Sequence, residues 1–124
     1  MAADPFWAVR GPDSAQREPT IGVSATRIVQ TTNFTIAVYD QSGMALWSAA
    51  LDQVVEPPPP ATPYFWDGVS NPVPNEYFFD PRVLFDQFSG RFVVMALHHN
   101  QRAFVVAFSR DSSPDGPGFE HWDK

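Results

Sequence analysis

Two aspartates and one arginine in a short stretch are the first residues whose types and spacing could do chemistry. Asp80, Arg82 and Asp86 form a D-x-R-x-x-x-D pattern. The planar guanidinium of an arginine binds a carboxylate through two parallel hydrogen bonds, so Arg82 is a candidate binder of an acidic ligand. In the structural alternative, Asp80 and Asp86 together hold Arg82 and fix a hairpin. The structural alternative is favoured, because both acids are close to Arg82 in sequence.

The histidines and the remaining acids offer little for a metal. His98 and His99 are adjacent, so on a strand they point to opposite faces and do not converge on one ion. Asp111 and Asp115 lie in a turn rich in Gly, Pro and Ser. Oxygen-rich turns suit calcium, but two carboxylates are a small ligand set. We therefore predict no cofactor, with calcium at Asp111 and Asp115 as a weak alternative.

Aromatic side chains in segments rich in proline and glycine are the other candidate binding groups. Trp7, Tyr64 and Trp66 lie in such segments, and exposed aromatics on the loops of a rigid scaffold often hold sugars or peptides. We therefore regard these three residues and Arg82 as candidate ligand-binding residues. The alternative is that the cluster around Trp66 folds back as a cap and packs on the strands. Trp47 and Trp122 are expected in the core, and no residue is assigned a catalytic role.

The composition restricts the class of protein and of partner. Hydrophobic residues make up 44% and charged residues 18% of 124, which is typical of a globular domain. The net charge of −6, without a stripe of Lys and Arg, argues against a nucleic-acid partner. There is no Cys, which excludes disulfides and thiol nucleophiles. No apolar run approaches the roughly 18 residues of a membrane span, and no signal peptide is visible, so the localisation is left unknown.

The elements that position these residues are predicted to be strands. Thirteen Pro and seven Gly interrupt short β-branched and aromatic runs, and no long window shows a helical period. The sequence therefore predicts an all-β fold with turns at the links, including a positive φ at Gly90. Eight strands in two groups are expected: Ile21–Ser24, Arg27–Thr32, Thr35–Asp40 and Ala45–Leu51, then Arg82–Phe85, Arg91–His98, Ala103–Ser109 and Phe119–Trp122.

The two groups of strands have the same order of strands, turns and marker residues. In each, a short strand and a turn precede an apolar strand that begins with Arg27 or Arg91, and the last strand carries Trp47 or Trp122. Two four-stranded antiparallel meanders that close with a Trp are typical of β-propeller blades. A two-layer β-sandwich made from the same strands is the alternative.

Two stretches carry a family resemblance. "TRIVQTTNFTIAVYDQSG" and "FFDPRVLFDQFSGRFVVMALHHN" resemble consecutive blades of bacterial surface or secreted β-propellers that are distantly similar to sialidases. The resemblance implies an extension at 1–19, one blade at 20–51, a connector at 52–79 and a second blade at 80–124. It also implies a location at the cell surface or outside the cell.

Two blades do not close a ring, so we expect either part of a longer propeller or a homo-oligomer, for instance three copies that give six blades. The first functional hypothesis is a non-enzymatic binding or assembly module that contacts a glycan or a protein through its loops. The second is part of a catalytic, glycan-hydrolysing propeller. The third is a purely structural, self-assembling protein.

Overall fold

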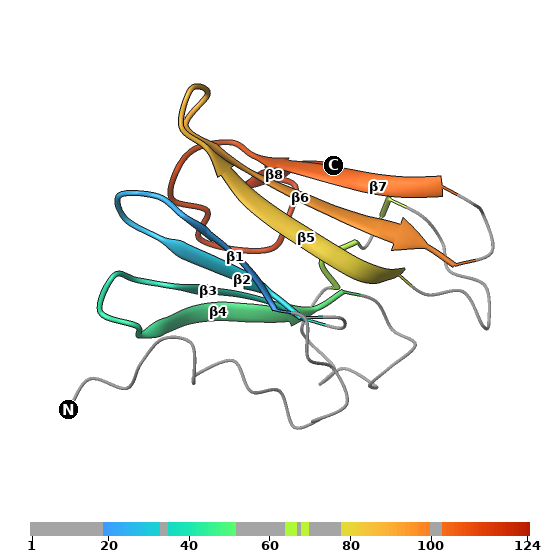
Figure 1. Ribbon diagram of the computed structural model, residues 1–124, viewed down its shortest axis with the longest axis horizontal. Helices are drawn as coiled ribbons and strands as arrows, with labels where there is room; N and C mark the ends of the chain where they lie inside the picture. Colours follow the sequence, from blue (N-terminus) through green and yellow to red (C-terminus); the bar gives the residue numbers. More distant parts are fainter. Residues whose placement is uncertain (1–18, 33–34, 52–63, 67, 70–77, 100–102) are drawn as a thin grey trace.

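The computed structural model describes residues 19–32, 35–51, 64–66, 68–69, 78–99 and 103–124, and these form two β-sheets without a helix (Figure 1). Each sheet is a four-stranded antiparallel meander in which neighbours in sequence are neighbours in space. The predicted all-β fold with two meanders is confirmed. Sheet one contains β1 (Thr20–Val23), β2 (Ile28–Thr31), β3 (Thr35–Tyr39) and β4 (Ala45–Ala50); sheet two contains β5 (Phe78–Asp86), β6 (Arg91–His98), β7 (Ala103–Ser109) and β8 (Trp122–Asp123).

Two of the chain reversals are built by an aspartate and a glycine. Asp40, between β3 and β4, accepts the backbone N–H groups of Ser42 and Met44 at 2.8 and 3.0 Å. Asp86, between β5 and β6, accepts the N–H of Phe88 at 3.0 Å. Gly43 and Gly90 close these turns at φ 87° and 70°, so the prediction for Gly90 is confirmed. The same turn chemistry thus joins the third and fourth strands of sheet one and the first and second strands of sheet two.

Two strands differ from the predicted bounds by more than one residue. β5 begins at Phe78 instead of Arg82, because a bulge between Phe79 and Arg82 carries the chain past Pro81. Proline has no N–H for the ladder, so a bulge is where it is tolerated. β8 begins at Trp122 instead of Phe119. The N–H groups of His121 and Trp122 both bond to the carbonyl of Gly118, which makes the preceding residues a turn.

A single apolar core lies between the two sheets. Buried residues of sheet one, such as Val29 and Val38, and of sheet two, such as Phe92 and Trp122, belong to one cluster. The sheets come closest where β1 lies beside β5 (Figure 1). A Cβ on Gly22 would lie 3.0 Å from the carbonyl carbon of Leu84, so a larger residue would require the backbone of β5 to move by a few tenths of an ångström. Both the blade-pair and the sandwich interpretations share this packing.

A short segment between the sheets completes the core. The N–H groups of Phe65 and Trp66 bond to the carbonyls of Ala50 and Leu51, just past the end of β4. The ring of Phe65 lies edge-on to those of Trp66 and Trp122, at 4.7 and 5.1 Å between centroids. Both Phe65 and Trp66 are fully buried. The segment folds back as a cap, as one sequence interpretation predicted.

Candidate functional site

Arg82 lies on β5 and points away from the core. Its Nη2 is 3.0 Å from the Oδ1 of Asp80, and the two side chains are 46% and 40% exposed. Asp80 itself has φ 52°, in the bulge that precedes Arg82. The ion pair is therefore local and solvated, with nearly half of the Arg82 side chain exposed to water.

Asp86 does not share in holding Arg82 as the sequence suggested. Its carboxylate is engaged in its own turn, where the hydroxyl of Ser89 and the N–H of Phe88 lower its pKa. Asp80 and Asp86 are six residues apart on one strand, and a strand rises about 3.3 Å per residue. The three residues therefore do not form a single site, because Asp80 lies near the start of β5 and Asp86 lies at its end.

The tentative aromatic binding residues behave differently from one another. Trp66 is buried among Phe65 and Phe78, so it takes the packing role and not that of an exposed binding group. Tyr64 is half-buried beside it. Trp7 lies outside the described residues. Trp47 is half-buried and Trp122 is buried, both with their indole N–H groups bonded to backbone carbonyls, which bears out a structural role.

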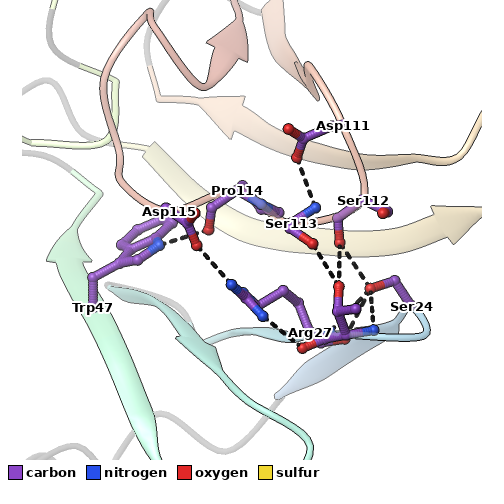
Figure 2. Close-up of polar contacts among 9 residues, drawn as sticks. Ser24, Arg27, Trp47, Asp111, Ser112, Ser113, Pro114 and Asp115 are labelled. Carbon is purple, nitrogen blue, oxygen red and sulfur yellow. Dashed lines mark hydrogen bonds and ion pairs between the residues drawn. The ribbon is translucent and has the colours of Figure 1, made fainter.

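Of the two acids considered as calcium ligands, Asp115 takes part in a polar contact between the sheets, whereas Asp111 bonds within its own loop (Figure 2). Asp115, in the loop between β7 and β8, lies 2.9 Å from the guanidinium of Arg27, at the start of β2. Asp111 accepts the N–H of Ser113 at 2.7 Å. The two carboxylates thus serve different partners. No group of three or more metal-ligating side chains occurs among the residues that the structure describes.

Three further hydrogen bonds join the same loop to sheet one (Figure 2). The hydroxyl of Ser24 donates to the carbonyl of Ser112 at 2.8 Å, and the hydroxyls of Thr26 and Ser113 are 2.5 Å apart. Trp47 on β4 donates to the carbonyl of Pro114 at 2.9 Å. This contact, which we call the inter-sheet clamp, comprises Ser24, Thr26, Arg27 and Trp47 on one side and Ser112, Ser113, Pro114 and Asp115 on the other. No local pattern in the sequence predicts this clamp, because its partners are 67 to 88 residues apart.

The histidines do not converge. His98 is buried, and its ring lies edge-on to that of Phe78 at 4.9 Å. His99 is half-buried. His121 lies 3.7 Å from Glu120 in the loop before β8. The arrangement agrees with the expectation that each histidine is a separate packing or surface residue.

The most unusual surface of the described part is the side of sheet two that faces away from sheet one. Cross-strand pairing aligns its side chains in rows, because residues opposite each other in a ladder share a face. Leu84 and Phe104 are 55% and 63% exposed, and Met95 and Phe108 are also exposed. We call this surface the outer face of sheet two; it consists of Phe79, Arg82, Leu84, Val93, Met95, Leu97, Phe104, Val106 and Phe108.

A signal for this face was present in the sequence. The residues 92–97 and 103–108 read FVVMAL and AFVVAF, without a polar residue at alternate positions. Strands that are apolar on both sides are typical of sheets that are covered on both faces. Here the inner side is buried against sheet one, while the outer side remains exposed.

The outer face of sheet one is different. Gly22 faces sheet two, as do the residues that pair with it across β2 and β3. Gln30 and Ala37 are each one position along their strand from those residues, so their side chains face away from sheet two. Gln30, Ala37 and Tyr39 are nevertheless buried. Burial raises the pKa of the Tyr39 hydroxyl. Much of this face is therefore already shielded from water within the single chain, in contrast to the outer face of sheet two.

Comparison of the chain with protein-family models, with curated proteins and with solved structures finds no match. No helix in the described part of the chain is long and apolar enough to cross a membrane.

Proposed function

We propose that this protein is a non-enzymatic binding or assembly module, built from two blade-like meanders, that contacts another protein through the outer face of sheet two. One observation carries the proposal. A sheet face three strands wide presents large apolar side chains to water, among them Leu84, Phe104 and Phe108. Monomeric proteins rarely leave contiguous apolar patches of more than a few hundred Å² exposed, and larger ones mark sites of interaction.

The size of the face is sufficient to drive association. With about 150–250 Å² for a large side chain, the exposed fractions of its members amount to roughly 400–500 Å². Burial at about 25 cal/mol per Å² contributes about 10 kcal/mol for one partner. Association costs about 4–15 kcal/mol in lost freedom. Burial on one side thus roughly offsets the cost of association, and the apolar surface that the partner buries adds the net stabilisation of the complex.

The chemistry of the face favours a protein over a glycan. Sugars are held by aromatic rings together with hydrogen-bonding groups that fix their orientation. The outward side chains of β6 from Val93 to Leu97 and those of β7 are apolar, and the charged Arg91 at the start of β6 lies over the ring of Phe108. The charged groups lie at the margins, with Arg82 on β5 and Asp123 on β8. An apolar centre with a charged rim is the pattern of a protein–protein interface.

The test is the molar mass in solution. We expect the wild type at micromolar concentration to be heavier than 13.8 kDa by light scattering, and Phe104→Asp to return it to that mass. Met44→Asp is the matched control, because Met44 is as exposed as Phe104 but lies in the turn before β4. A wild type of monomeric mass up to high concentration would contradict assembly through this face.

A further inference from the structure

Resting on the proposed function, we infer that the partner at the outer face of sheet two is a second copy of this chain, packed face to face about a two-fold axis. The same surface is then used by both copies. This differs from the ring expected for propeller blades, in which the outer face of sheet two would contact the outer face of sheet one of the next copy.

The difference between the two outer faces supports the two-fold arrangement. A head-to-tail ring requires both faces to be open, since each copy uses both. On sheet one, Gln30, Ala37 and Tyr39 are buried within the single chain, and Val23 on the edge strand β1 is 57% exposed. On sheet two, Leu84 and Phe104 are more than half exposed. One open face per copy gives a closed dimer, because the interface of a two-fold dimer is a patch that complements itself.

The shape and size of the face fit another sheet of the same kind. Sheets pack face to face about 10 Å apart with interdigitated side chains, as the inner side of sheet two already does against sheet one. Two copies of this face bury roughly 800–1,000 Å² of apolar surface before the rim is counted. Specific interfaces begin near 1,200 Å² in total. The apolar surface alone is thus somewhat smaller than that class, and the polar rim of both copies adds to the buried area.

The charges at the margins do not oppose this packing. Arg82 is paired with Asp80 on one side of the face. On the other side Asp123 bonds to Arg91 and lies 3.1 Å from Arg110. Both margins thus carry charges of both signs, and contact brings no isolated carboxylate into the apolar centre. The net charge of −6 on each chain gives a long-range repulsion that added salt screens.

Sedimentation equilibrium of the intact chain tests the inference. We expect a reversible equilibrium between monomer and dimer, tightened by salt. Phe104→Asp and Leu84→Asp, both on the outer face of sheet two, should each raise the dissociation constant by about tenfold or more while the melting temperature at low protein concentration is kept. Two variants are used so that a fold defect in one does not decide the result.

Val23→Asp separates the dimer from the ring. Val23 is 57% exposed and faces away from sheet two, because it follows Gly22 on β1. The Val23→Asp variant should therefore leave a two-fold dimer unchanged but disrupt a ring. A trimer or larger species that Val23→Asp and Phe104→Asp both dissociate would overturn the inference and leave the proposed function standing. A wild type that stays monomeric would overturn the inference and the assembly part of the proposed function, and would leave a different protein as the partner of this face.

Discussion

The indole N–H of Trp47 donates to the backbone carbonyl of Pro114, 2.9 Å away, and so joins β4 of sheet one to the loop that precedes β8 of sheet two. Pro114 is buried, and its carbonyl is an acceptor that needs a partner. The bond spans 67 residues of sequence. It ties together two sheets that share a core but no ladder.

We predict that Trp47→Phe lowers the free energy of unfolding by about 1–3 kcal/mol, because the carbonyl of Pro114 is left without its donor. Chemical denaturation followed by circular dichroism measures the loss. Ser48→Ala is the control, since Ser48 is the next residue on β4 and is exposed. Equal free energies of unfolding for Trp47→Phe and the wild type would show that the hydrogen bond makes no net contribution to stability.

Two glycines are predicted to resist substitution for different reasons. Gly90 has φ 70° with open space around its missing Cβ, whereas Gly22 has backbone atoms of Leu84 and Phe85 at 3.0 and 3.1 Å from that position. Gly90→Val should cost about 1–3 kcal/mol through strain, and Gly90→Asn much less, because asparagine tolerates a left-handed backbone. Gly22→Ala and Gly22→Asn should both destabilise, since a Cβ at this position would push against the backbone of β5. A melting temperature of Gly90→Asn as low as that of Gly90→Val would contradict the strain argument.

Acid is predicted to weaken the two aspartate turns. The hydroxyl of Ser42 lowers the pKa of Asp40, and the hydroxyl of Ser89 lowers that of Asp86, each from the usual 3.8. A lowered pKa in the folded state means that the stabilisation is present above the unfolded value and is lost as the pH falls through the folded value. Urea midpoints between about pH 5 and about pH 2 should therefore fall. The fall should be smaller in Asp40→Asn/Asp86→Asn, and an identical pH profile for that variant would refute the assignment.

Arg82→Ala is predicted to cost little stability, about 0–1 kcal/mol, because the pair with Asp80 is half-exposed and screened by water. Removing the arginine does not leave two carboxylates side by side, since Asp86 is held in its own turn. The melting temperature should therefore be close to that of the wild type at both neutral and acidic pH. A loss of several kcal/mol that acid restores would mean that the aspartates do meet.

The strands could be predicted from the sequence because local signals specify them. Runs of β-branched and aromatic residues gave the bounds of β6 and β7, and the turn at Gly90 followed from residues that tolerate a positive φ. The bulge beside Pro81 was missed, since a strand was expected to start only after the proline. Bulges depend on pairing with a neighbour as well as on the residue itself.

The contacts between the sheets could not be predicted in the same way. The inter-sheet clamp joins residues of the turn between β1 and β2, such as Ser24 and Thr26, to a loop more than 80 residues later. No local pattern encodes such a pairing. The exposed role suggested for Trp66 was wrong for the same reason: composition showed a loop rich in proline, but not that the Trp66 ring is buried beside Phe65 and Phe78.

The close approach of β1 to β5 also has a kinetic consequence. Each meander forms from neighbours in sequence, whereas the bond from the N–H of Val83 to the hydroxyl of Thr20 closes a loop of 63 residues. Local hairpins form faster than contacts that close long loops. We expect the meanders to form first and to dock later, so that a transient species exposes both inner faces. Gly22→Ala, which obstructs docking without altering a turn, should lengthen the lifetime of that species and make refolding more prone to aggregation.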